Sequence, residues 1–308
     1  MTAAVRVAAS EQGRAGIEAI RQRLAVRPRD ETLPVEDRRA ALEAFTGPSS
    51  DRVAIVHETH AGVSVERHDP PGAPSSTAIV YAHGGAYVIG SARTHRALAA
   101  AVAAAAGVRL YAVDYRLAPE HPFPAGRDDI VAVSEKLIGN GVALALFGDS
   151  AGGGLLLQAA LAMRARPAAI AVTSPWVDLA MSDDVDEPSA AAEAMLTPAG
   201  LGLDARRYLN GRDPRDPAVA VLEAELRNLP PLLIQVGDQE LLLGDALALA
   251  ERARAADVCV SFEIWESMIH SWHAFRGPVP EADEAIARIG SFLRSHLGLA
   301  HRHQGDSR

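Results

Sequence analysis

A serine flanked by glycines is the pattern in this sequence with the clearest chemical meaning. Residues 148–152 read GDSAG, which matches the Gly-x-Ser-x-Gly nucleophile elbow, a sharp turn that exposes the serine hydroxyl between a strand and a helix. An apolar run at 142–147 precedes the pattern and a helical pattern at 155–163 follows it, as an elbow requires. The alternative is a glycine-rich helix start that Ser150 merely caps. We predict that Ser150 is a nucleophile.

A serine hydroxyl needs a general base within hydrogen-bond distance, because it is too weakly acidic to attack an ester unaided. In enzymes with this elbow the partners follow in the order serine, carboxylate, histidine, so the base should come after the last strand. Among the 11 histidines, His270 follows a strand-like segment at 260–265 and precedes the last helical pattern. His273 shares the same loop and is the alternative base. We predict that His270 is the base.

The carboxylate that orients this histidine is expected in the loop after the apolar run 232–236. Site residues gather at the carboxyl ends of parallel strands, and this loop contains Asp238, Glu240 and Asp245. Asp238 also suits a turn, and Asp245 suits the start of a helix, where the helix dipole stabilises a negative charge. The residues alone leave the choice between Asp238 and Glu240 open.

A glycine-rich loop is expected to hold the negative charge that develops on the substrate. Residues 83–86 read HGGA and follow a predicted strand at 79–82, where backbone amides can be directed at an oxyanion. The predicted oxyanion hole consists of Gly84, Gly85, Ala86 and Ala151. His83 resembles a catalytic residue, but we expect it to anchor the loop by hydrogen bonds.

Short apolar runs without alternation are typical of strands that are buried on both faces of a sheet. Such runs occupy 78–82, 108–113, 142–147, 168–173 and 232–236. Helical patterns lie between and after them at 93–106, 128–138, 151–165, 244–256 and 280–297, while 53–57 and 63–68 alternate like antiparallel edge strands. This order predicts an α/β fold with a mostly parallel sheet and helices on both faces.

Two segments do not fit the strand and helix alternation, and we expect both to form a helical cap. Residues 1–48 are charged and helical, and 180–228 contain helical pieces near 190–195 and 202–209 but no buried strand. The predicted core therefore comprises 49–179 and 229–298. Residues 299–308 are expected to form a disordered tail.

The amino-acid composition limits the kinds of molecule that the protein is expected to bind. The formal net charge of -9 disfavours nucleic acid and anionic lipid, so we expect neither nucleic acid nor stable membrane association. The single cysteine, Cys259, lies in an apolar run and is expected to be inert in a buried strand. Charged residues in the first segment argue against a secretory signal and favour a cytoplasmic location. The sequence does not decide between a monomer and a homodimer.

Taken together, several motifs resemble the hormone-sensitive-lipase-like esterases, also called bacterial family IV. They are HGGAYVIGS at 83–91, YRLAPEHPFPA at 115–125, GDSAGGG at 148–154, SPWVDL at 174–179 and HSWHAF at 270–275. The resemblance spans about residues 50 to 295. It implies an α/β-hydrolase fold with an eight-stranded core and a helical cap. It also implies no cofactor and a small-molecule ester of short to medium acyl length as substrate.

The resemblance assigns the nucleophile to Ser150, the base to His270 and the oxyanion amides to Gly85, Ala86 and Ala151. Two positions depart from the family pattern. Glu240 stands at the family's aspartate position, so we predict Glu240 as the acid that orients His270, with Asp238 as the alternative. Ala86 replaces the last glycine of the triplet at a cost of about 1 kcal/mol if φ there is positive. The expected activity is that of a carboxylesterase working through an acyl-enzyme. The alternatives are an amidase or deacetylase, or a non-catalytic receptor on the same scaffold.

Overall fold

A mostly parallel sheet forms the centre of the protein, in a computed structural model that describes residues 4–25, 33–45, 52–180 and 193–299. In these residues it has nine strands in the order β1-β9-β8-β7-β6-β4-β5-β3-β2, and only the β2–β3 and β3–β5 pairs are antiparallel. The strands are β1 (Val5–Val7), β2 (Ala54–His60), β3 (Val63–Asp69), β4 (Thr77–Ala82), β5 (Arg109–Val113), β6 (Ala143–Asp149), β7 (Ile170–Thr173), β8 (Leu232–Gly237) and β9 (Val260–Trp265).

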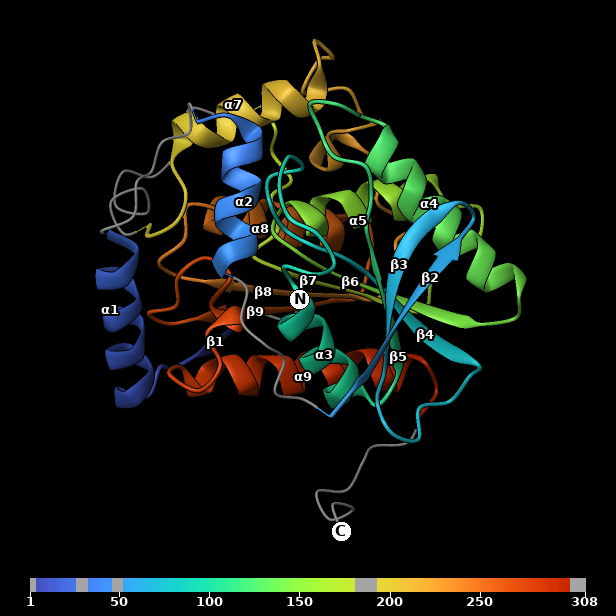
Figure 1. Ribbon diagram of the computed structural model, residues 1–308, viewed down its shortest axis with the longest axis horizontal. Coiled ribbons are helices and arrows are strands. Elements are labelled where there is room, and N and C mark those ends of the chain that lie inside the picture. The colour runs from blue at the N-terminus through green and yellow to red at the C-terminus, as the bar shows by residue number, and fades with distance from the viewer. Residues whose placement is uncertain (1–3, 26–32, 46–51, 181–192, 300–308) are drawn as a thin grey trace.

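Helices cover both faces of this sheet. They are α1 (Glu11–Ala25), α2 (Val35–Phe45), α3 (Arg96–Ala106), α4 (Ala125–Gly139), α5 (Ala151–Ala162), α7 (Pro198–Leu209), α8 (Leu243–Ala255) and α9 (Pro280–His296), with short 3-10 turns η1 (Val221–Glu223) and η2 (Trp272–Ala274). In β4, Ile79 and Tyr81 pack in the core beside α3 and α9, whereas Val80 and Ala82 pack in the core beside α4, α5 and α8 (Figure 1). All four are fully buried, which explains the unbroken apolar run in the sequence.

The sequence-based prediction of an α/β-hydrolase sheet is confirmed, but the expected number of eight strands is wrong. Val5–Val7 add a ninth strand, which pairs parallel to β9 at Glu263–Trp265. This strand has only three residues and Val5 is 51% exposed, so the sequence contains no buried apolar run that would predict the strand. Cys259 is also misplaced by the sequence reasoning, because it is exposed and directly precedes β9 instead of lying buried within it.

Helices α2 and α7 lie above the edge of the sheet where β6, β7 and β8 end (Figure 1). A bidentate ion pair joins the two helices, with the Arg38 guanidinium 2.8 and 2.7 Å from the carboxylate oxygens of Asp204. Arg39 ties α2 to the core by donating to the backbone oxygens of Val88 and Ala118 at 3.0 and 3.1 Å. Both charged contacts therefore hold α2 over the carboxyl ends of the strands.

Three sequence-based expectations concern segments that are only partly described. Residues 193–195 are not helical, so the expected helix near 190–195 is absent from its described part, while α7 covers the helical piece expected at 202–209. The tail from residue 300 onward lies outside the described residues, as do residues 181–192 of the expected cap insertion. Among the described helices, none has the length and apolar character needed to cross a lipid bilayer.

Candidate active site

Ser150 occupies the turn between β6 and α5 with a positive φ of 53°. Its amide donates to the backbone oxygen of Thr173 at 2.9 Å, which fixes the turn against the neighbouring strand. Gly152, two residues further on, allows close packing, because a Cβ at this position would lie 2.1 Å from the backbone oxygen of Ala82. The elbow pattern in the sequence therefore reflects a real steric requirement.

Substituting Gly152 by alanine is expected to destabilise the fold. The new methyl group would collide with backbone, which has no rotamer to yield, so we expect the free energy of unfolding to fall by about 1–3 kcal/mol. Urea denaturation measures this loss. Gly139→Ala is the matched control, since no described atom outside its own helix backbone and chain neighbours lies within 4 Å of its Cβ position at the end of α4. Equal stability of both variants would contradict the packing argument.

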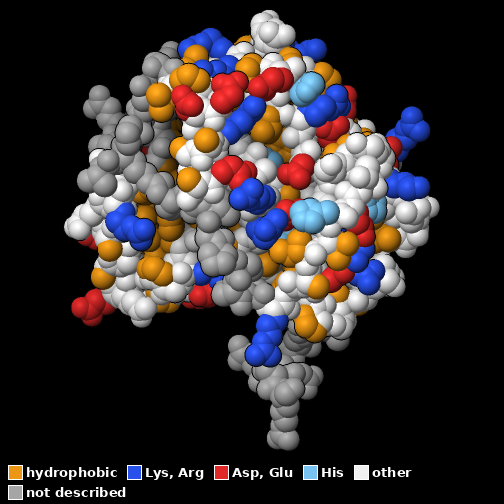
Figure 2. Space-filling view, viewed as in Figure 1, with side chains coloured by type: hydrophobic (Ala, Val, Ile, Leu, Met, Phe, Trp, Pro, Cys, Tyr) orange, Lys and Arg blue, Asp and Glu red, His pale blue; other side chains and the backbone are white. Residues whose placement is uncertain are grey.

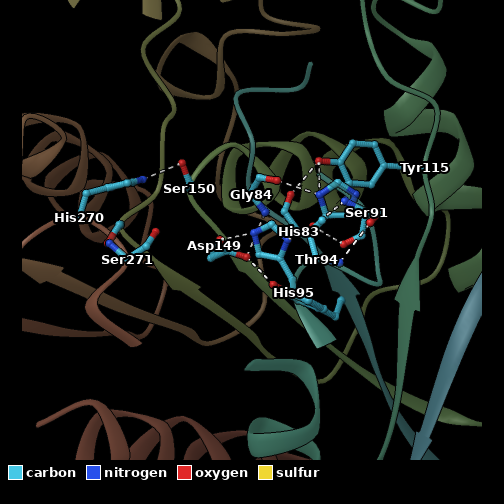
Figure 3. Close-up of polar contacts among 12 residues, drawn as sticks. His83, Gly84, Ser91, Thr94, His95, Tyr115, Asp149, Ser150, His270 and Ser271 are labelled. Atoms are coloured by element: carbon cyan, nitrogen blue, oxygen red, sulfur yellow. Dashed lines mark hydrogen bonds and ion pairs between the residues drawn. The ribbon is translucent and has the colours of Figure 1, made fainter. Parts of the chain in front are cut away.

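The side chains of Ser150, His270 and Glu240 form a continuous hydrogen-bonded chain. His270 Nε2 lies 3.0 Å from Ser150 Oγ, and His270 Nδ1 lies 3.1 Å from Glu240 Oε2. Figure 3 shows the imidazole of His270 pointing at the serine hydroxyl. The chain brings together residues separated by 120 positions in the sequence.

The competing carboxylates have other partners. Asp238 Oδ1 accepts a hydrogen bond from the amide of Ser267 at 2.7 Å and so fixes the turn after β9. Asp245 Oδ2 accepts from the amides of Val177 and Asp178, both at 2.8 Å, and holds the loop after β7. Glu240 is therefore the carboxylate that meets His270, and its longer side chain spans the gap.

The competing histidine has a different hydrogen-bond partner. His273 Nε2 contacts Gln235 Oε1 at 2.9 Å, on the α9 side of β8. Burial, reinforced by the nearby His270, lowers its pKa to about 3, so His273 is neutral at ordinary pH. The structure thus brings His270, and not His273, into contact with Ser150.

Glu240 is fully buried and held by two further donors that the sequence reasoning missed. Its Oε1 accepts from the amide of Gly237 at 2.7 Å and from the hydroxyl of Ser174 at 2.8 Å. The Ser174 oxygen in turn accepts from the amide of Ser271 at 3.3 Å, which links the acid to the loop that carries His270. Ser174 opens the SPWVDL motif, so the motif was visible in the sequence although its role was not.

The buried carboxylate of Glu240 makes His270 a stronger base. Burial alone would lower the pKa of His270, but the hydrogen bond and negative charge of Glu240 outweigh it and raise the pKa above 6.5. Burial raises the pKa of Glu240, and the hydrogen bond with His270 opposes that rise. An imidazolium formed by proton transfer is therefore stabilised where it forms.

The HGGA loop, residues 83–86, lies beside the serine. Gly85 has φ 122° and Ala86 has φ 54°, so the alanine carries the strain of about 1 kcal/mol expected for a Cβ in this region. The prediction that Gly84 donates to the oxyanion needs correction, because its amide donates to Asp149 Oδ1 at 3.1 Å. The amides of Gly85 and Ala86 have no recorded acceptor within the described residues, and that of Ala151 is at the N-terminus of α5.

His83 supports this loop and does not reach the serine. Its ring stacks on that of Tyr115 with centroids 4.3 Å apart, and the Tyr115 hydroxyl donates to the His83 backbone oxygen at 2.7 Å. Burial and the neighbouring His95 lower the pKa of His83 to about 3. These contacts agree with the anchoring role expected from the sequence.

Asp149, the variable residue of the GDSAG pattern, is a second feature that the sequence reasoning missed. Besides Gly84, its Oδ1 accepts from the Tyr81 hydroxyl at 2.6 Å. The carboxylate therefore connects β4, the glycine-rich loop and the position before the nucleophile (Figure 3). The Gly-x-Ser-x-Gly pattern does not specify which residue occupies the position of Asp149, so only the structure reveals this connection.

A cavity of about 510 Å³ lies between these residues and the overlying helices. Ser150 and His270 line its floor, while Leu42 of α2 and Leu201 of α7 line its roof. On the face of the molecule shown in Figure 2, acidic and basic side chains are intermixed around apolar ones. The lining of the cavity is mostly apolar, and the nucleophile Ser150 and the base His270 lie at its floor.

Comparison with known proteins gives consistent matches over most of the chain. A family model described as the α/β-hydrolase fold matches residues 79–274. An acetyl-hydrolase from Streptomyces hygroscopicus is 41% identical over 278 residues, covering 86% of this chain and 91% of the relative. An esterase from Acinetobacter venetianus is 35% identical over 231 residues, covering 72% of this chain and 76% of the relative.

A solved structure agrees with these matches. The crystal structure of an esterase from the bacterial hormone-sensitive lipase family superposes with a TM-score of 0.87 at 40% sequence identity. The match covers 95% of this chain and all of that chain. The similarity therefore extends beyond the core into the segment that precedes it.

Proposed function

Because the chain belongs to the hormone-sensitive-lipase-like family of α/β-hydrolases, we propose that it is a carboxylic ester hydrolase acting on short to medium acyl esters. The observation that carries this proposal is the hydrogen-bonded chain from Ser150 through His270 to Glu240 at the floor of a cavity. An activated serine beside free backbone amides is the arrangement that acyl transfer requires.

In the first step Ser150 Oγ attacks the ester carbonyl carbon while His270 Nε2 takes the hydroxyl proton. The amides of Gly85, Ala86 and Ala151 stabilise the resulting oxyanion. The carbon–oxygen bond to the alcohol then breaks, and His270 returns its proton to the departing alcohol. Water, deprotonated by His270, hydrolyses the acyl-enzyme and releases the acid and the free serine.

The cap in this proposal is formed by residues 1–48 and 180–228, with the core at 49–179 and 229–298. Its support is the position of α2 and α7 over the cavity and the ion pair between Arg38 and Asp204. The strand Val5–Val7 is an exception within the first segment, since it belongs to the sheet. We place the substrate between this cap and the serine.

Hydrolysis of acetyl groups is a second candidate activity. A relative that is 41% identical carries the name acetyl-hydrolase. The same catalytic residues could also hydrolyse an acetyl amide, whose bond is less reactive than that of an ester. A series of p-nitrophenyl esters of increasing chain length, with acetanilide as the amide, distinguishes these activities. A maximum at short acyl groups with little amide turnover supports the esterase, and faster amide turnover would support a deacetylase.

Changing Glu240 to glutamine is expected to lower kcat by about 10⁴-fold, because a neutral amide can orient the wrong imidazole tautomer and cannot stabilise the imidazolium. Asp238→Asn is the matched control, since an asparagine oxygen can still accept from the amide of Ser267. Hydrolysis of p-nitrophenyl acetate measures both variants. A large loss in Asp238→Asn with normal activity in Glu240→Gln would reverse the assignment of the acid.

The pH dependence of kcat/KM follows from the state of His270. The imidazole of His270 must be neutral to accept a proton, and its pKa is raised above 6.5. We therefore expect kcat/KM to fall by about tenfold for each pH unit below the pKa of His270. Removing the charge of Glu240 lowers that pKa, so the acidic limb of Glu240→Gln should move to lower pH. Stopped-assay profiles between pH 5 and 9 test this, and an unmoved limb would contradict the coupling.

A further inference from the structure

One wall of the cavity contains polar atoms that have no partner in the described residues. Thr173 and His273 both line the cavity, and their side chains are at least 99% buried. Within the part of the chain that the structure describes, neither Thr173 Oγ1 nor His273 Nδ1 has a hydrogen-bond partner. Buried polar groups in folded proteins are nearly always paired, so two unpaired atoms beside a nucleophile call for a partner from outside the chain.

The protonation of His273 follows from its neighbour Gln235. The amide nitrogen of Gln235 donates to Glu263 Oε2 at 2.9 Å and to the backbone oxygen of Ala285 at 3.2 Å. Its oxygen therefore faces His273 Nε2 at 2.9 Å, and that nitrogen must carry the proton. Because His273 is neutral, the remaining nitrogen, Nδ1, is an acceptor with an unused lone pair.

A second polar pair lines the same cavity. His95 Nε2 is 3.7 Å from Asp149 Oδ2, which is too long for a direct hydrogen bond, and both residues line the cavity. The other oxygen of Asp149 is already occupied by Tyr81 and Gly84. Figure 3 shows His95 and Asp149 facing one another on the side of Ser150 away from His270. A hydroxyl placed beside this pair can donate its proton to Asp149 Oδ2, the oxygen that Tyr81 and Gly84 do not contact.

The opposite wall, under the cap, has a different character. Leu33, Leu42 and Leu201 are among its residues, and its charged groups, Arg38 and Asp204, already bond to each other. Unpaired hydrogen-bonding atoms therefore lie on the side of the serine near α3 and η2, and apolar surface lies on the side of the cap. The two halves of a bound ester meet different chemistry.

We propose that Asp149, His95, Thr173 and His273 form a subsite for hydroxyl groups, so that the protein prefers esters carrying hydroxyls on one side of the scissile bond and an apolar group on the other. This inference rests on the proposed ester hydrolase function. The unpaired atoms are mainly acceptors, which suits a hydroxyl that donates, and Thr173 Oγ1 can also donate.

Two matched ester pairs test the subsite. Propyl acetate against glycerol monoacetate varies the alcohol, and p-nitrophenyl butyrate against its 3-hydroxybutyrate analogue varies the acyl group. For the wild type we expect kcat/KM to favour the hydroxylated member of at least one pair by about tenfold, as one to two added hydrogen bonds allow. The readout in every variant is this ratio.

The variants remove single atoms from the proposed subsite. Thr173→Val deletes the hydroxyl at nearly constant volume, and Thr173→Ser restores it. His273→Gln keeps a donor towards Gln235 but lacks the Nδ1 acceptor, whereas His273→Asn keeps a polar atom near the Nδ1 position. Thr77→Val is the control, because Thr77 is also a buried strand threonine with an unpaired hydroxyl but does not line the cavity.

We expect the ratio to fall several-fold towards one in Thr173→Val and His273→Gln, to recover in Thr173→Ser, and to stay at the wild-type value in Thr77→Val. A wild-type ratio near one for both pairs would overturn the proposal, and so would a high ratio that Thr173→Val leaves intact. If His273→Gln fails to fold, as judged by circular dichroism, the Thr173 series decides alone. Absence of hydrolysis of every ester by the wild type would overturn the proposed function itself, and the subsite with it.

Discussion

Ser150→Ala is expected to lower kcat for p-nitrophenyl esters by about 10⁶-fold. The methyl group cannot form the acyl-enzyme, so only the free amides of the oxyanion hole and substrate binding remain to accelerate hydrolysis. The variant should fold normally, because the Ser150 hydroxyl has the imidazole of His270 as its recorded side-chain partner and the turn is fixed by backbone contacts. Active-site titration and initial rates measure the loss.

A covalent label separates catalysis from simple binding in the same experiment. An organophosphonate should modify wild-type Ser150 with one equivalent, and Ser150→Ala should not react. Ser64→Ala is the control, since Ser64 is exposed on β3 and far along the sheet from the elbow. A wild-type protein that binds esters but neither turns them over nor reacts with the label would be a receptor. Near-normal turnover in Ser150→Ala would refute the nucleophile.

The sheet could be predicted from sequence because most of its strands are buried on both faces. Apolar runs such as 142–147 and 232–236 correspond to β6 and β8, where every residue of β8 is buried. The same logic fails at the edges. Val5–Val7 is too short for a pattern, and Cys259 belongs to an apolar triplet whose middle residue faces solvent before β9 begins.

The site was predictable where a local pattern fixes backbone geometry. The elbow at 148–152 imposes its own steric demands, and the position of His270 after the last strand follows from chain order. The residues alone left the choice between Glu240 and Asp238 open, because both lie in one loop, and only the family resemblance favoured Glu240. The structure separates them by their partners, His270 for one and the amide of Ser267 for the other.

Some residues contact the site from segments that are distant in the sequence, and no sequence pattern predicted them. Ser174 reaches Glu240 from the neighbouring strand, and Glu193 accepts from the amide of Leu241 at 3.0 Å, next to the acid. The negative charge of Glu193 raises the pKa of both Glu240 and His270. An isolated serine or glutamate has no characteristic spacing, so only the fold identifies such contributions.

His270→Ala is expected to lower kcat by about 10⁶-fold, close to the loss for Ser150→Ala. Without the imidazole, no other side chain among the described residues is hydrogen-bonded to the serine hydroxyl to take its proton or to return it to the departing alcohol. The pH dependence set by the imidazole should vanish with it. Glu240 loses its histidine partner but keeps the donors Gly237 and Ser174, and it can take up a proton because burial already raises its pKa, which limits the loss of stability.

The double variant Ser150→Ala/His270→Ala gives the sharpest test, because residues that act as one unit are not additive. We expect its kcat to equal that of either single variant, whereas independent roles would multiply the losses. His296→Gln serves as the control, since His296 is exposed at the end of α9. If His273 were the base, His270→Ala would keep most of its activity and its acidic limb. That result would contradict the contact of 3.0 Å between His270 and Ser150 as the route of the proton.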